Sequence, residues 1–195
     1  MLRSVFLMTK IIFLTLLIVG IFTAASLATN EAYAAVDMFL KIDGIDGEAV
    51  DLVGDHTNDI EVLAWSWGMT QSGPIGNSAG AGKVNIQDLS ITKFIDRSST
   101  DFWEFLAEDE GCSTCDGFGE VVLTVRNAGD PVDYLMITLK NVRVTSVSTG
   151  GFSADDRITE TITLNFSEIE MQYTPQNATG DPEPKTWNYK KPGHR

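Results

Sequence analysis

The sequence predicts an all-β fold, either a small antiparallel β-barrel or a two-sheet sandwich, with one short α-helix. Segments in which apolar and polar residues alternate recur along the chain and are rich in β-branched residues, a pattern typical of half-buried strands. Turn signals such as Asp43-Gly44, residues 127–131 and Gly150-Gly151 separate these segments. Hydrophobic residues make up 43% of the 195 residues, which is enough for a core.

Strand segments are predicted at residues 37–42, 59–68, 83–94, 119–127, 133–149 and 157–174. The second has Ile60 and Val62 on one face and Trp65 on the other. Because both faces are mostly apolar, we expect one strand that is covered on both sides. In the last segment the apolar side changes between Leu164 and Ile169. We therefore expect a bulge there, or a move from one sheet to another.

A helix is predicted within residues 96–110, where four apolar side chains share one face: Phe102, Trp103, Phe105 and Leu106. Ser98 followed by Asp101 is typical of a capping box at the start of a helix. Acidic residues crowd the other end, at 108–110, where the helix dipole disfavours negative charge. The helix should therefore be short.

Residues 1–34 have the pattern of a secretory signal peptide. Arg3 and Lys10 provide the positive n-region, an apolar run follows, and small residues precede a cut between Ala34 and Ala35. The alternative is an uncleaved membrane anchor, but the apolar run is shorter than the roughly 20 residues that a spanning helix needs. No cysteine lies in this segment, so a lipid anchor is not expected.

The predicted cut divides the chain into a signal peptide, a β-barrel domain at residues 35–175 and a polar tail at residues 176–195. The tail contains one short possible strand, whose Trp187 and Tyr189 would dock on the body. A cleaved signal peptide predicts a secreted or periplasmic protein with no stable membrane anchor.

The charge of the chain excludes some classes of function. The formal net charge is −13, and removal of residues 1–34 takes away two basic and one acidic residue, which gives −14. Nucleic acid is therefore not an expected partner, because no basic face is visible. His56 and His194 are too few and too far apart in the sequence for a histidine-based metal site.

The two cysteines, Cys112 and Cys115, form a CSTC motif. In an exported chain the leading interpretation is a disulfide between them. A redox-catalytic pair usually opens a helix, whereas this pair follows one. Two cysteines supply only half of a zinc site, and haem attachment fails because Asp116 follows Cys115.

Two further motifs suggest chemistry. The segment GNSAGAGKV resembles a phosphate-binding loop, but Asn77 and Val84 stand where that loop needs Gly and Ser or Thr. Asp155 and Asp156 could act as paired carboxylates, but a polar turn between two strands explains them as well. We therefore predict no catalytic residue, no cofactor and no metal site.

Several blocks of the sequence together resemble a known family. They are VDMFLKIDGIDGEA, EVLAWSWGMTQSG, GAGKVNIQDLSITKFIDRSS, DYLMITLKNVRVTSVSTGG, DDRITETITLNFSEIEMQYTPQ and TWNYK. In this order they closely resemble the Hcp family (haemolysin-coregulated proteins), the tube proteins of type VI secretion systems. The resemblance covers residues 35–191 and implies two packed β-sheets that form a small barrel, with a helix at its side.

The resemblance also implies an assembly. Hcp subunits form six-membered rings, and the rings stack into a hollow tube beneath a spike protein. Some members carry small effector proteins inside the ring. Because each subunit here would carry about −14, we expect assembly to strengthen with salt or divalent cations.

In the family, the region that corresponds to residues 70–83 is an extended loop that contacts the next subunit or ring. The resemblance therefore implies four subunit-contact residues: Gln71, Pro74, Ile75 and Lys83. Two features depart from the family pattern, namely the signal-peptide segment (the leader) at residues 1–34 and the region around the CSTC motif.

Two hypotheses follow. The first is a ring- and tube-forming structural component of a type VI secretion system. The second, suggested by the leader, is an exported Hcp-like protein that forms rings or filaments, or acts as a carrier, without a contractile machine. An enzyme is not expected, because no catalytic constellation is visible.

Overall fold

The computed structural model describes residues 36–72, 83–108, 117–153, 156–176 and 183–192. The predicted signal peptide and its cleavage site between Ala34 and Ala35 lie outside these residues. Within the described residues, no helix is long and apolar enough to cross a membrane.

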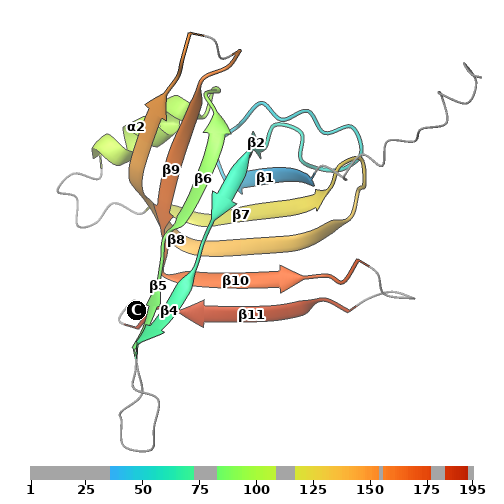
Figure 1. Ribbon diagram of the computed structural model, residues 1–195, viewed down its shortest axis with the longest axis vertical. Coiled ribbons are helices and arrows are strands. Elements are labelled where there is room, and N and C mark those ends of the chain that lie inside the picture. Colours follow the sequence, from blue (N-terminus) through green and yellow to red (C-terminus); the bar gives the residue numbers. More distant parts are fainter. Residues whose placement is uncertain (1–35, 73–82, 109–116, 154–155, 177–182, 193–195) are drawn as a thin grey trace, which may run out of the picture. The chain divides into compact units, whose positions relative to one another are not determined.

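The described chain consists of strands and one helix, which confirms the all-β prediction (Figure 1). The elements are β1 (Val36–Ile42), β2 (Ile60–Glu61), β3 (Ala64–Ser66), β4 (Met69–Ser72), β5 (Lys83–Ile86), β6 (Leu89–Phe94), α2 (Ser99–Glu108), β7 (Phe118–Asn127), β8 (Asp133–Gly150), β9 (Thr159–Asn165), β10 (Glu168–Tyr173) and β11 (Lys185–Lys190).

Strand β8 joins the two halves of the barrel. Its first half pairs with β7 on one side and with β10 on the other, and β11 adds to the far side of β10. Its second half pairs with β9, which in turn pairs with β6. All of these pairings are antiparallel, and the strands of the two halves run in different directions (Figure 1).

The change of direction occurs at Asn141, whose backbone has a φ of 51°. This left-handed conformation is one that asparagine tolerates better than most residues. The Asn141 amide donates to the Ser167 hydroxyl at 2.7 Å, and the Ser167 N–H donates to the Lys140 carbonyl at 3.0 Å. Ser167 lies between β9 and β10, so both partners turn at the same place. The predicted move between sheets is therefore confirmed.

The barrel is closed by the short segment that links β2 to β3. The Val62 N–H donates to the Met38 carbonyl on β1 at 2.9 Å, and the Leu63 N–H donates to the Thr92 carbonyl on β6 at 2.8 Å. The prediction of one strand at residues 59–68 is wrong, because the chain leaves β1 for β6 at this point. Ile60 and Val62 are buried, but Ala64 is exposed, so the expected cover on both sides is also incomplete.

The core is built from inward-facing side chains of both halves and from one residue of the helix. Its fully buried members include Leu40, Leu89, Ile91, Phe102, Val121, Leu123, Ile137, Leu139, Ile162 and Leu164. Phe102 of α2 packs edge-on against Phe118, with ring centroids 6.2 Å apart. The predicted helix face is only partly buried, because Trp103 is 43% and Phe105 is 40% exposed.

The start of α2 is held differently from the predicted capping box. The Ser98 hydroxyl and N–H both donate to the Asp96 carboxylate. The Asp96 N–H in turn donates to the Ser99 hydroxyl at 3.1 Å. The cap is therefore Asp96, two residues before the Ser98 that the sequence suggested.

Truncation of Phe102 to Ala should lower the free energy of unfolding by about 3–5 kcal/mol, because it removes the buried anchor of the helix. Urea denaturation at neutral pH measures this change. Trp103→Ala is the matched control, since this adjacent side chain is largely outside the core. Equal losses in the two variants would mean that Phe102 does not fix the helix.

Candidate functional site: an arm and a groove

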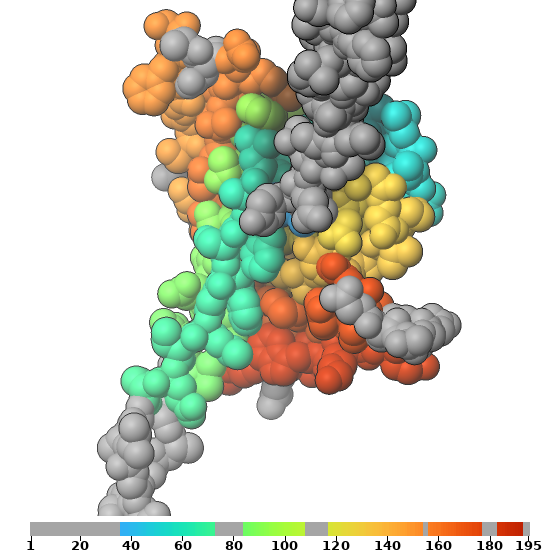
Figure 2. Space-filling model, turned by 45° about the vertical axis from the view of Figure 1, so that its right-hand side comes forward, coloured from blue at the N-terminus to red at the C-terminus, as the bar shows by residue number. Residues whose placement is uncertain are grey.

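Strands β4 and β5 form an arm that stands away from the barrel (Figures 1 and 2). They pair with each other as a separate two-stranded sheet, with Gln71 opposite Val84 and Ser72 opposite Lys83. Of the predicted contact residues, Gln71 is exposed in β4 and Lys83 begins β5. Pro74 and Ile75 lie outside the described residues, so the contacts themselves stay a prediction.

Aromatic side chains fix the base of the arm to β11. The ring of Trp67 lies 5.8 Å from that of Trp187, which stacks on Tyr189 at 6.3 Å. The Gln87 N–H donates to the Gly68 carbonyl at 2.9 Å and closes the base of the arm. The short strand predicted in the tail is β11, and its aromatic residues contact the body as expected.

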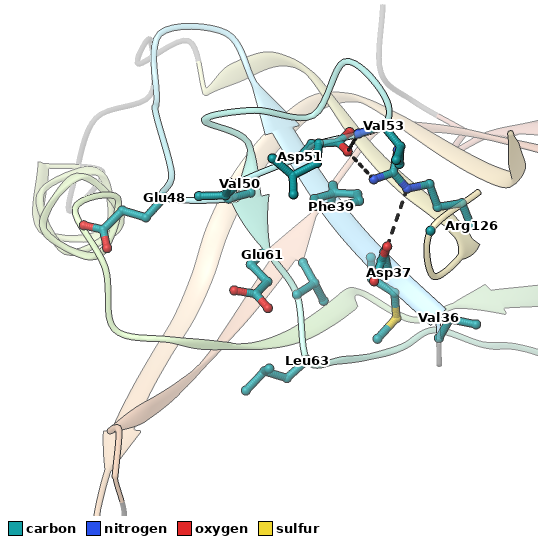
Figure 3. Close-up of a pocket in the computed structure, with 15 residues that line it drawn as sticks. Val36, Asp37, Phe39, Glu48, Val50, Asp51, Val53, Glu61, Leu63 and Arg126 are labelled. Atoms are coloured by element: carbon teal, nitrogen blue, oxygen red, sulfur yellow. Dashed lines mark hydrogen bonds and ion pairs between the residues drawn. The ribbon is translucent and has the colours of Figure 1, made fainter. Parts of the chain in front are cut away.

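A groove of about 580 Å³ lies at the other side of the barrel (Figure 3). It is lined by residues 48–53, by the start of β1 and by residues 61–63. Figure 3 shows Val50 and Leu63 on opposite walls, with Asp37 and Arg126 beside them. The groove therefore combines an apolar lining with charged groups.

A buried ion pair lies beside this groove. The Arg126 guanidinium donates to the Asp51 carboxylate at 2.6 Å, and both side chains are almost fully buried. This hydrogen bond, helped by backbone N–H donors, holds the pKa of Asp51 well below its usual range although burial opposes the shift. The same bond raises the pKa of Arg126. Both groups therefore stay charged at neutral pH.

An aromatic contact extends this cluster to His56. The Arg126 guanidinium lies over the Phe39 ring at 4.8 Å, and Phe39 stacks on the His56 ring at 4.6 Å. The His56 ring nitrogens contact Asp59 at 2.8 Å and Asp133 at 3.4 Å. These contacts connect the loop after β1 to the start of β8.

A second buried cluster fixes α2 to the barrel. The Lys93 ammonium donates to Asp96 at 2.7 Å and lies 3.0 Å from Glu160, with both Lys93 and Glu160 fully buried. The Ser99 hydroxyl also donates to Glu160 at 2.6 Å. One lysine of β6 therefore joins the start of the helix to a carboxylate of β9.

These clusters support structure rather than chemistry. In the described parts of the chain, no group of three or more His, Cys, Asp or Glu side chains is placed to hold a metal. Cys112, Cys115 and Asp155 lie outside those parts, so the predicted disulfide stays a prediction.

Sequence reasoning missed all five buried charged residues of the described chain: Asp51, Asp59, Lys93, Arg126 and Glu160. A signal for two of them was present. Lys93 and Glu160 stand in phase with the apolar residues of their strands, which is where a charge must be buried and paired. Arg126 gives no such signal, because it lies on the outer face of β7 and is covered by a loop.

A protein-family model described as "Type VI secretion system effector, Hcp" matches residues 39–173. The chain belongs to the Hcp family. It is 47% identical over 150 residues to protein hcp1 of Pseudomonas aeruginosa, an alignment that covers 75% of this chain and 88% of that protein.

Solved Hcp structures share the fold. Hcp1 from Salmonella typhimurium is 34% identical, with a TM-score of 0.63 over 80% of this chain and 95% of that one. A type VI secretion system effector from Yersinia pestis is 29% identical, with a TM-score of 0.64 over 80% of this chain and 100% of that one. These matches confirm the family and the fold that the sequence predicted.

Replacement of Asp51 by Asn should destabilise this Hcp protein most at neutral pH. A carboxyl group whose pKa is lowered by folding stabilises the folded state above its unfolded pKa, and this contribution is lost as the pH falls. The difference in melting temperature between wild type and Asp51→Asn should therefore be largest at neutral pH and become smaller below about pH 4. Asp55→Asn, an exposed change in the same loop, is the control. A pH-independent difference would contradict this assignment.

Replacement of Lys93 by Met should cost about 3–5 kcal/mol, because it leaves Glu160 buried without its cation. The double variant Lys93→Met/Glu160→Leu should recover much of this loss, since no unpaired charge remains. Lys140→Met is the matched control, because Lys140 and Glu120 form an exposed pair worth about 0–1 kcal/mol. Chemical denaturation of wild type and of these three variants measures their free energies of unfolding. A double variant no more stable than Lys93→Met would contradict the assignment of an unpaired charge as the cause of the loss.

Proposed function

We propose that six copies of this Hcp protein close into a ring, and that rings stack into a hollow tube of a type VI secretion system. Hcp proteins are structural tube components of these systems. The observation that carries the proposal is the β4–β5 arm, which pairs only with itself among the described strands and extends beyond the barrel (Figure 1). A neighbouring subunit can supply the packing contacts that an arm of this kind lacks within its own barrel.

The edges of the barrel support an assembly. Strand β11 pairs with β10 alone among the described strands, so its other edge faces outward. Exposed strand edges invite pairing with other chains unless they are covered. Closure of a ring covers such edges in a defined way, because each subunit meets its neighbour through two different faces.

Further parts of the proposal rest on the sequence. Gln71, Pro74, Ile75 and Lys83 contact the next subunit or ring, and a spike protein and small effectors are the further partners. The signal peptide predicted at residues 1–34, with its cut between Ala34 and Ala35, supports the alternative of an exported Hcp-like protein. Residues 35–175 then form the barrel domain, and residues 176–195 form the tail.

Hcp proteins are secreted through the type VI system, so secretion itself follows from the family. The proposed Cys112–Cys115 disulfide suits an oxidising compartment. None of the matched proteins favours the alternative of an exported ring or carrier that acts without a contractile machine.

Negative-stain electron microscopy with mass measurement tests the proposal directly on the purified protein. We expect six-fold rings whose proportion rises with salt, because screening weakens the repulsion between acidic subunits. Replacement of residues 73–82 by Asn-Gly, which closes the arm with a tight turn, should abolish stacked tubes and leave single folded barrels or rings. Circular dichroism confirms that the barrel is intact. A monodisperse monomer under all conditions would overturn the proposal.

A further inference from the structure

In the loop that forms one wall of the groove, a charged side chain is buried and large aliphatic side chains are exposed, which is the reverse of a normal globular surface. Ala49 and Asp51 face inward and are buried, whereas Val50 is 78% and Leu52 is 89% exposed. Val53, the next residue, is 46% exposed. Charged residues are normally outside and large aliphatic residues inside. An ordered loop with the reverse arrangement indicates a surface that another chain covers.

This exposure is fixed by hydrogen bonds. The Asp51 carboxylate accepts from the N–H groups of Val53, Gly54 and His56 at 3.0–3.1 Å, in addition to Arg126. The Ala49 N–H donates to the Asp59 carbonyl at 3.0 Å and closes the base of the loop. Because the inward residues are held in place, Val50 and Leu52 cannot turn toward the core without breaking these bonds.

The groove selects an apolar and basic occupant. Across from the loop, Val36 is 42% and Leu63 is 36% exposed, so both walls offer aliphatic surface. Four carboxylates line the groove. Arg126 bonds to Asp51 and lies 3.7 Å from Asp37, and Glu48 lies 3.9 Å from the exposed Arg97. Among the described residues, Glu61 is the carboxylate that remains for a partner. Glu61 is exposed beside Leu63 and lies on the rim. A partner that brings positive charge and apolar side chains matches this surface.

Strand β11 offers that chemistry at the opposite edge of the same sheet. In the strand order β1-β7-β8-β10-β11, β11 is the last strand on the side away from β1 (Figure 1). The start of β1 lines the groove. Trp187 is 37% exposed on β11, Tyr173 is 44% exposed on the neighbouring β10, and Lys185 is exposed at the start of β11.

We infer that the groove beside residues 48–53 binds the β11 edge of a second copy of this chain. The two faces differ, so the contact is head-to-tail, which is the type that closes rings. The inference rests on the proposed ring and identifies the two surfaces that hold neighbouring subunits together. The β4–β5 arm then takes no part in this contact and remains available for other contacts with the next subunit or ring.

Mass photometry of the full chain over a range of concentrations tests the inference. Val50→Ser/Leu52→Ser should raise the concentration needed for half-assembly at least tenfold, with an unchanged melting temperature because both side chains are exposed. Phe152→Ser is the matched control, since Phe152 is 83% exposed at the β8–β9 end and should leave assembly unchanged.

A charge exchange tests the identity of the occupant. Glu61→Lys and Lys185→Glu should each weaken assembly, and the double variant should return toward wild type because opposite charges face each other again. Unchanged assembly of Val50→Ser/Leu52→Ser, or no recovery in the double variant, would overturn the inference while the wild-type ring, and thus the proposed function, stands. A wild type that never assembles would overturn both.

Discussion

The sharing of β8 between two sheets is the constraint on which the rest of this barrel depends. The strand has 18 residues, and its two halves have different partners on either side of Asn141. The left-handed asparagine and its bond to Ser167 turn β8 and its partner strand at one corner. That corner directs β6 and β9 across the barrel and leaves β10 and β11 as an extension of the other sheet. The positions of the arm, the groove and the β11 edge all follow from it.

Alternation of side chains was sufficient to predict most strands, because burial of one face imposes a period of two on the sequence. It also located the change of sheet between Leu164 and Ile169, where the apolar face inverts. It failed at residues 59–68, where periodicity continues although the hydrogen-bond partner changes from β1 to β6. A pattern of side chains records which face is buried and does not record which strand lies alongside.

The candidate site was harder to predict for a related physical reason. The arm has a local signal, a glycine-rich insertion between two alternating segments. The groove has none, because Asp51 and Arg126 are 75 residues apart and become partners only through the pairing of β1 with β7. Their bond reverses the usual distribution of polar and apolar residues in the loop. A reader of the sequence alone would place Asp51 in solvent and Leu52 in the core.

The pairing of β1 with β7 also bears on how the chain folds. Val36 lies opposite Asn127, so the first described strand cannot find its longer neighbour until β7 has been synthesised. Contacts of such large sequence separation carry a high loop-closure cost and slow the search for the native topology. During that interval the strands that will later form the barrel expose apolar faces and unpaired edges. The amino-terminal strand therefore stays without its longer partner until the chain has been made as far as Asn127.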